Sequence, residues 1–347
     1  MTTETTLGYG YAEVGTVDVL TRSARQRRAP GVGEVEIEVV RSGVNPTDVK
    51  SRRGATHMDI PPGLVQIPHH DGSGVVSAVG DGVSHFAVGQ RAWVNLAAYR
   101  RLDGTAQQFL TIPVERVAPL PESASFELGA TLGVPFLTAH RLLTCHQVGP
   151  RELAVGALSG ATVLVAGGAG AVGNAAIQLA RWAGAKVITT VSSARKQRLA
   201  EAAGADHVIN YREDDVVSGV RAVAPDGVDV IVEVSPAGNA TIDRDVLRTG
   251  GGVSIYANDG GPELTLPILP FMWLSASVQF VILYTIPAVH LAAGVRALDA
   301  AMRDRAIDVG AGHGLPILTY GLDDIAAAHK AVEDAVVGKV QLAVSGE

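Results

Sequence analysis

Cysteine is almost absent from this sequence: Cys145 is the single one among 347 residues. One thiol excludes an internal disulfide and any cysteine-rich metal site, and it favours a reducing compartment, so we expect a cytoplasmic protein. Charged residues are also scarce, at 18%, while hydrophobic residues make up 47%, which is typical of a well-packed globular chain. The formal charge of −7 disfavours a nucleic-acid partner, because such a partner needs a basic face.

Charge is missing altogether between Leu264 and Val295, which raises the question of a membrane span. A spanning helix needs about 20 apolar residues, and this run is long enough. Three prolines interrupt it, however, and the segment SVQFVILYT (277–285) is rich in β-branched and aromatic residues. We therefore expect a buried or interface strand there and no membrane span. The N-terminal residues show no pattern of a secretion signal.

Two patterns of hydrophobicity divide the chain. Up to about residue 130, short alternating segments such as GEVEIEVVRSGV are separated by glycine turns, which predicts half-buried strands in a small barrel. Beyond that point, apolar strands at 162–167, 186–191, 207–211, 228–234 and 251–257 alternate with segments of helix length. This alternation predicts the α/β class, with a doubly wound parallel sheet of the Rossmann type.

A glycine loop follows the first of these strands. Gly168, Gly170 and Gly173 satisfy G-x-G-x-x-G between a strand at 162–166 and a helix, which is the context in which this motif binds a dinucleotide. The helix N-terminus presents free N–H groups and a partial positive charge to the pyrophosphate. A tight turn without a ligand is the alternative explanation.

Acidic residues are missing where a dinucleotide-binding unit often has one. The second strand ends at Ser192 and Ser193, followed by Lys196, and no Asp or Glu lies between Glu152 and Glu201. An acid at this place holds the 2′-hydroxyl of NAD, whereas hydroxyls and a lysine favour the 2′-phosphate of NADP. We predict NADPH as the cofactor. The alternative, that these basic residues only form an exposed helix face, leaves the missing acid unexplained.

Four blocks in order resemble the medium-chain dehydrogenase/reductase superfamily, and within it the zinc-free, zeta-crystallin-like NADPH:quinone oxidoreductases. They are GVNPTDVKSRRG (43–54), IPHHDGSGVVSAVGDGVSHFAVGQRAWV (67–94), LGVPFLTAHRLL (132–143) and GADHVINYRED (204–214). The resemblance implies a GroES-like β-barrel domain formed by both chain ends (1–135 and 286–347), a Rossmann domain (136–285), and an active cleft between them.

The resemblance also implies residue roles. Lys196 and Tyr211 resemble the residues that hold the 2′-phosphate, and Thr138 falls where the family contacts the nicotinamide ribose. The full set of expected cofactor contacts is Asn45, Thr138, Gly168, Gly170, Ala171, Val172, Gly173, Ser192, Ser193, Lys196, Tyr211, Val234, Ser235, Tyr256 and Asn258. The run Phe280–Leu283 resembles the edge strand that pairs across the family's homodimer.

Zinc is not expected. Relatives that bind catalytic zinc use a Cys, a His and another Cys or Asp, but here Asn45 stands where the first Cys would be. His70 matches the place of the His ligand, and one remaining ligand cannot hold a catalytic zinc.

The expected reaction is therefore hydride transfer from NADPH to an electron-poor acceptor. Asn45 is the candidate donor to the acceptor's carbonyl oxygen, Asp48 the candidate that orients its neighbours, and Lys50 a candidate cation or proton donor. For Asp48 a turn role, and for Lys50 a solvated surface role, stay open. Quinones are preferred as acceptors, because no cleft tyrosine is present to protonate carbon. An enone or enoyl reductase, and a non-catalytic NADPH-binding protein, are the alternatives.

Overall fold

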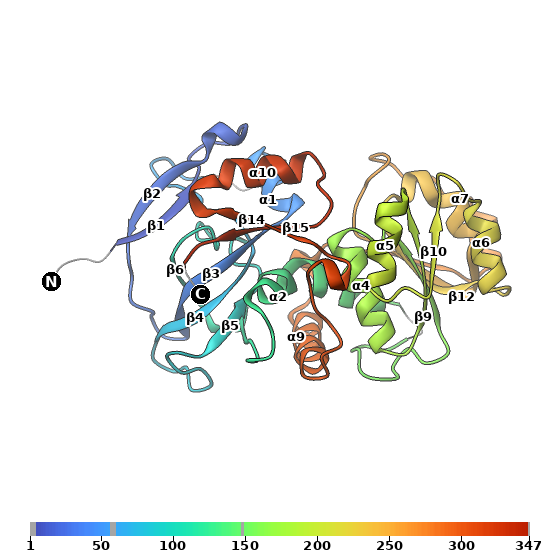
Figure 1. The fold of residues 1–347 in the computed structure, drawn as a ribbon, viewed down its shortest axis with the longest axis horizontal. Coiled ribbons are helices and arrows are strands. Elements are labelled where there is room, and N and C mark those ends of the chain that lie inside the picture. Colours follow the sequence, from blue (N-terminus) through green and yellow to red (C-terminus); the bar gives the residue numbers. More distant parts are fainter. Residues whose placement is uncertain (1–4, 56–59, 147–148, 346–347) are drawn as a thin grey trace. The chain divides into compact units, whose positions relative to one another are not determined.

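The computed structural model describes residues 5–55, 60–146 and 149–345. Within these residues the chain forms two compact units, one running through Val134 and resuming at Ile317, the other formed by residues 135–316. The first unit thus contains segments from both ends of the chain, coloured blue and red in Figure 1.

The first unit is built on a mainly antiparallel sheet with the strand order β14-β15-β3-β4-β5-β7, and β6 also pairs with β3. This is the expected GroES-like domain. Its elements are β1 (Thr5–Gly10), β2 (Thr21–Gln26), β3 (Glu34–Val44), α1 (Pro46–Arg52), β4 (Asp71–Val79), β5 (Arg91–Val94), β6 (Phe109–Pro113), β7 (Val117–Pro119), α2 (Phe126–Thr131), β14 (Ile317–Gly321), α10 (Ile325–Glu333) and β15 (Lys339–Ala343).

Strand β3 is more deeply buried than its alternating sequence predicts. Its polar position Glu36 is only 2% exposed, because β4 and β6 flank this part of the strand on both edges. The Glu36 carboxylate accepts hydrogen bonds from Arg27 and Ser77, each at 2.6 Å. A buried carboxylate with two such donors is satisfied, so one polar position of the alternation is buried while Glu38, two residues on, is exposed.

The second unit contains the predicted parallel sheet, with the strand order β10-β9-β8-β11-β12-β13. The order reverses between β8 and β11, which is the topological switch point of a Rossmann sheet. Its elements are α3 (Leu137–Thr144), β8 (Thr162–Ala166), α4 (Ala171–Trp182), β9 (Lys186–Val191), α5 (Ala194–Ala202), β10 (His207–Asn210), α6 (Val216–Val223), β11 (Val228–Glu233), α7 (Pro236–Val246), β12 (Leu247–Ile255), α8 (Ile268–Trp273), β13 (Ser277–Phe280) and α9 (Ala288–Arg303).

Helix α9 belongs to the second unit, whereas the sequence placed residues 286–347 in the barrel domain. The reason is its packing on α3: a Cβ built on Gly294 would lie 2.8 Å from Leu137. The chain returns to the first unit at Ile317, where β14 begins.

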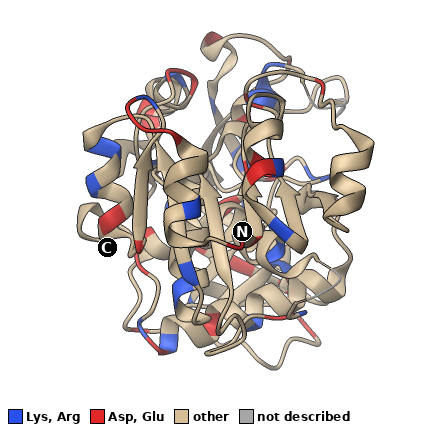
Figure 2. Ribbon diagram, turned by 90° about the vertical axis from the view of Figure 1, so that its right-hand side faces the viewer, with Lys and Arg blue, Asp and Glu red and all other residues tan. Residues whose placement is uncertain are grey.

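No helix in the described part of the chain is long and apolar enough to cross a membrane. The uncharged run from residue 264 is divided between α8, β13 and the beginning of α9. On the side of the molecule drawn in Figure 2, basic and acidic residues are interspersed and do not gather on one element.

Candidate functional site

The loop between β8 and α4 separates glycines that the fold needs from one that it does not need. A Cβ on Gly168 would lie 2.2 Å from Thr189 Oγ1, and one on Gly173 would lie 2.4 Å from the carbonyl oxygen of Gly167. Gly170 has an ordinary φ of −82°, and a Cβ there would come no closer than 3.4 Å to any atom. Internal packing therefore does not explain glycine at position 170, whereas the close approach of a bound pyrophosphate would explain it.

The first turn of α4 is open to a ligand. Gly170 is its N-cap, which has no side chain to cap the first turn that Ala171 and Val172 begin, and no side chain of the described residues takes its place. Unpaired N–H groups at a helix N-terminus form an anion site when a glycine loop leads into it. The loop is thus suited to a pyrophosphate.

The carboxyl end of β9 gathers the residues predicted to hold the 2′-phosphate. The amino group of Lys196 donates to Ser192 Oγ at 3.0 Å, and Ser193 caps α5 by accepting the Lys196 N–H. The Tyr211 N–H donates to the Val191 carbonyl oxygen at 3.0 Å, which fixes the backbone of Tyr211 beside Ser192. The Tyr211 side chain is half exposed, so its hydroxyl is available to a ligand.

The expected contacts after β11 and β12 are joined at the same edge of the sheet. Asp259 N–H donates to the Val234 carbonyl oxygen at 3.1 Å, which holds the segment of Tyr256 and Asn258 against that of Val234 and Ser235. Burial raises the pKa of the Tyr256 hydroxyl, so this side chain stays neutral.

Glu233, which sequence reasoning missed, anchors this edge. Its buried carboxyl group accepts the Ser235 N–H and, at 3.0 Å, a hydrogen from the amide of Asn239. Burial raises the pKa of Glu233 and of the neighbouring Asp243. The sequence pattern that could have identified Glu233 is an acidic residue at the end of an apolar strand.

Thr138 lies in the first turn of α3 and is 6% exposed. It belongs to the second unit, as do all the other expected cofactor contacts except Asn45.

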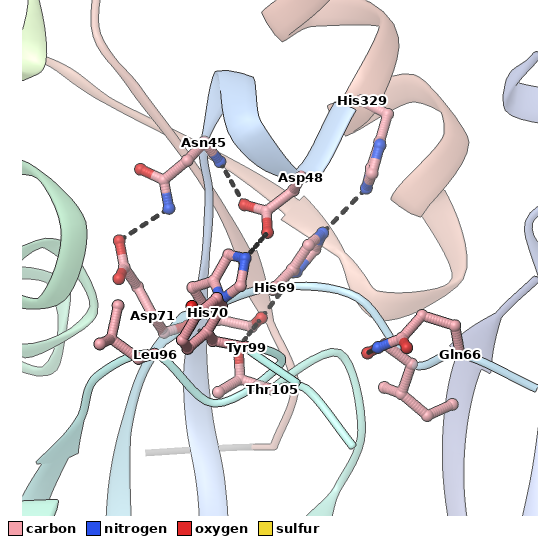
Figure 3. Close-up of polar contacts among 12 residues, drawn as sticks. Asn45, Asp48, Gln66, His69, His70, Asp71, Leu96, Tyr99, Thr105 and His329 are labelled. Carbon is pink, nitrogen blue, oxygen red and sulfur yellow. Dashed lines mark hydrogen bonds and ion pairs between the residues drawn. The ribbon is translucent and has the colours of Figure 1, made fainter. Parts of the chain in front are cut away.

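In the first unit, Asn45 and Asp48 lie together at the start of α1 (Figure 3). Asp48 Oδ2 accepts the Asn45 N–H at 2.7 Å, and its other oxygen lies 3.9 Å from His70 Nε2. Burial, followed by the charge of Asp71, raises the pKa of Asp48 to about 7. Burial likewise lowers the pKa of His70 to about 3, so this imidazole is neutral at physiological pH. Asp48 thus contacts the Asn45 backbone as part of the cap of α1, an arrangement that fits both its orienting role and its turn role.

A chain of buried hydrogen bonds begins beside this pair, and its direction can be deduced. Thr105 donates its single hydrogen to the carbonyl oxygen of Asp71, so Ser42, at 2.7 Å, must donate to Thr105. His69 Nδ1 must then donate to Ser42, and His69 Nε2 accepts from His329 Nε2 at 2.9 Å. Because burial depresses the pKa of both histidines, the rings are neutral and the tautomers are fixed (Figure 3). The chain ends on a backbone carbonyl, which makes it a structural network.

A lysine that the sequence analysis did not name, Lys339, contacts Asn45, whereas the named candidate Lys50 does not lie in this buried cluster. Lys50 is exposed on α1, which agrees with its solvated alternative. Lys339, the first residue of β15, is 2% exposed; its amino group donates to Asn45 Oδ1 at 2.7 Å and lies 3.3 Å from Asp71 Oδ2. The sequence pattern that could have pointed to Lys339 is a lysine directly before the apolar strand VQLAV.

With this geometry in place, the chain can be compared with known proteins. Residues 31–122 match the alcohol dehydrogenase GroES-like domain, and residues 171–294 match the zinc-binding dehydrogenase family. The quinone oxidoreductase of Rattus norvegicus is 35% identical over 68% of both chains, and that of Lama guanicoe is 31% identical over 90% of this chain and 89% of its own. The chain belongs to the quinone oxidoreductase family. It is an oxidoreductase of the medium-chain dehydrogenase/reductase superfamily.

Solved structures agree with this assignment. Escherichia coli quinone oxidoreductase complexed with NADPH has a TM-score of 0.76 at 26% identity and covers 97% of this oxidoreductase and 99% of its own chain. CurK enoyl reductase has a TM-score of 0.79 at 25% identity, over 99% of this chain and all of its own.

The zinc named in the family description does not fit the residues of this oxidoreductase. A catalytic zinc needs three protein ligands and an open position. Here the oxygen of Asn45 and one oxygen of Asp71 already face the amino group of Lys339, which is a cation. A metal ion bound to these oxygens would have to displace that ion pair.

Proposed function

We propose that this oxidoreductase is a zinc-independent NADPH:quinone oxidoreductase. The observation that carries the cofactor assignment is the pair formed by Lys196 and Ser192 at the end of β9, where NAD-dependent relatives need an acid. A hydrogen bond to a charged group contributes roughly 1.5–3 kcal/mol. Two such bonds to a 2′-phosphate would favour NADPH over NADH by about a hundredfold or more.

NADPH, when bound, supplies the hydride. The first turn of α4 would hold its pyrophosphate. The 2′-phosphate would be held by Lys196, Ser192 and Tyr211. Asn45 donates to the acceptor's oxygen, where negative charge develops during reduction.

The quinone class is supported by the names of the relatives, which are 31–35% identical to this chain. The similarity to CurK enoyl reductase supports an enone or enoyl thioester as the second candidate acceptor.

The acceptor class is tested by steady-state oxidation of NADPH with a panel of quinones and a panel of enones at matched concentrations. We expect kcat/KM for the better quinones to exceed that for every enone. Faster turnover of enones would replace the first candidate by the second.

The cofactor is tested with the variant K196A. We expect kcat/KM for NADPH to fall about a hundredfold while that for NADH changes less than about threefold, because only NADPH carries the 2′-phosphate. Lys186 lies at the opposite, amino end of β9 and is exposed, so K186A is the matched control and should behave as wild type. Equal losses for both cofactors in K196A would defeat the assignment.

We also propose that the oxidoreductase is a homodimer, formed through the edge strand β13. A cytoplasmic location, expected from the single cysteine, stays a prediction.

A further inference from the structure

Lys339, Asn45 and Asp71 form a closed, buried ring of polar contacts in the first unit. Lys339 Nζ donates to Asn45 Oδ1 at 2.7 Å, Asn45 Nδ2 donates to Asp71 Oδ2 at 2.8 Å, and Lys339 Nζ lies 3.3 Å from the same Asp71 oxygen. All three side chains are at most 3% exposed.

The register of the sheet brings these distant residues together. Strand β15 runs antiparallel to β3 with Val340 opposite Val44, so Lys339 lies beside Asn45, the residue after β3. Asp71 opens β4 opposite Gly43. A Cβ on Gly43 would lie 2.2 Å from the carbonyl oxygen of Ala130, so the backbone of Ala130 requires a glycine there, and 3.2 Å from the Lys339 side chain, which passes close to Gly43.

The ring fixes the orientation of the Asn45 amide. An ammonium group only donates, so it must face Oδ1, and the other end of the amide, Nδ2, then faces Asp71. The amide nitrogen carries two hydrogens, and Asp71 takes one of them. Among the described residues no acceptor bonds the other hydrogen, which leaves it for a ligand. The hydrogen bond from Lys339 to Oδ1 polarises the amide and makes this N–H a stronger donor.

We propose that Lys339 is a positioning residue, which holds Asn45 so that its second Nδ2 hydrogen is donated to the carbonyl oxygen of the hydride acceptor. This inference rests on the function proposed above. During reduction the acceptor's carbonyl system gains a hydride and takes a proton from water, while Lys339 and Asn45 keep their protons. Without the lysine, Asn45 Oδ1 loses its buried donor and the amide can flip, which would present an oxygen to the acceptor's oxygen.

Stability alone does not account for this ion pair. Exchanging a buried ion pair for apolar side chains of similar volume is often neutral or stabilising. A buried lysine is therefore weak evidence for a structural role and agrees better with a role toward a ligand.

The test is a double-mutant cycle of K339M and N45A, measured as kcat/KM for the best acceptor. We expect each single variant to lose about 30- to 100-fold and K339M to lose less than about twofold further in the N45A background. N45D, which keeps an oxygen for Lys339 and has no N–H to donate, should match N45A. Because Asn45 is also an expected cofactor contact, the dissociation constant for NADPH is measured for every variant, so that a loss of cofactor binding is separated from a loss in kcat/KM for the acceptor. K330M, which removes an exposed lysine from α10 of the same unit, is the charge-matched control and should keep full activity.

Folding is controlled by thermal melting of each variant, and K339L, which also lacks a donor, replaces K339M if that variant does not fold. Independent losses that multiply in the double variant, or full kcat/KM in K339M, would overturn the inference.

A second readout needs no turnover. The NMR signals of the Asn45 side-chain amide, assigned with N45A, should be widely separated and slowly exchanging in wild type and should lose both properties in K339M. Unchanged signals in K339M would also overturn the inference, whereas an inactive wild type with the expected signals would reject only the proposed function.

Discussion

Single glycines in the loop before α4 can be tested for ligand binding and for folding separately. At Gly170 an alanine Cβ meets no atom within 3.4 Å and the backbone is ordinary, so G170A should fold with an unchanged melting temperature. If the pyrophosphate lies against this residue, the same methyl group should weaken NADPH binding at least about tenfold. Fluorescence titration with NADPH measures the loss.

The matched variant is G173A in the same loop. Its Cβ would lie 2.4 Å from the Gly167 carbonyl oxygen, which is backbone and cannot move aside easily. We expect overpacking to cost about 1–3 kcal/mol of unfolding free energy. If G170A bound NADPH as wild type does, the loop would be a tight turn without a ligand.

Asp48 links the folded state to pH. Its carboxyl pKa of about 7 lies above the ordinary value of 3.8, because the group is buried and lies near Asp71. Between these two values the unfolded carboxyl is ionised and the folded one keeps its proton, so the unfolding free energy falls as pH rises, by up to ~4 kcal/mol. In D48N this contribution is absent, and stability should fall less between pH 4 and 7 than in wild type.

Urea denaturation of both proteins at several pH values measures the difference. The comparison isolates Asp48, because the other titrating groups are present in both proteins. Parallel curves for wild type and D48N would show that Asp48 is ionised in the folded protein at pH 4.

At the scale of elements, the segment before β4 contains a residue with a strained backbone, and the hydrogen bonds of its side chain offset that strain. His69 has a φ of +79°, which favours glycine, yet its ring bonds Ser42 and His329. H69G relieves about 1 kcal/mol of strain. It also leaves the Nε2–H of His329 unpaired and removes the donor to Ser42, which still bonds Thr105. At about 1–3 kcal/mol for each lost hydrogen bond, we expect a net loss of roughly 1–5 kcal/mol by urea denaturation.

The control is Arg305, which also has a positive φ but does not take part in the buried histidine network. Arg305 follows the C-cap of α9 with a φ of +55° and is exposed. Glycine is the preferred residue at such a position, so R305G should stabilise by about 0.5–1 kcal/mol. Stabilisation by H69G as well would mean that the histidine pair contributes nothing to folding.

At the scale of the whole molecule, local patterns predicted the parallel sheet and placed Ser192 and Lys196 after the end of a strand, whereas the role of Tyr211 came only from the family resemblance. Each apolar run gave a strand, because a sheet covered on both faces needs little polar surface. The contacts that the sequence did not predict depend on pairing between distant strands. Lys339 and Asn45 meet because β15 pairs with β3, and no local pattern records that register. The return to the first unit at residue 317 was missed for a similar reason, since it depends on the packing of α9 against α3.

The last strand of the parallel sheet bears on assembly. Strand β13 pairs with β12, and among the described strands nothing pairs with its other edge. Phe280 is 64% exposed there, and Trp273 on the preceding α8 is 78% exposed. An unprotected edge flanked by large apolar side chains is suited to pairing with a second copy. Wild type should therefore have twice the mass of the chain in sedimentation equilibrium.

The variant F280D should be a monomer for two reasons. Burying a phenylalanine contributes about 1.5–3 kcal/mol, and a two-fold axis brings the same residue of both copies to the interface, so one substitution introduces two like charges. Val155 is similarly exposed, at 72%, in the loop between α3 and β8, and V155D should leave the dimer intact. Because Phe280 is not an expected cofactor contact, the monomer should still bind NADPH. A monomeric wild type, or dissociation by V155D as well, would show that β13 does not form the interface.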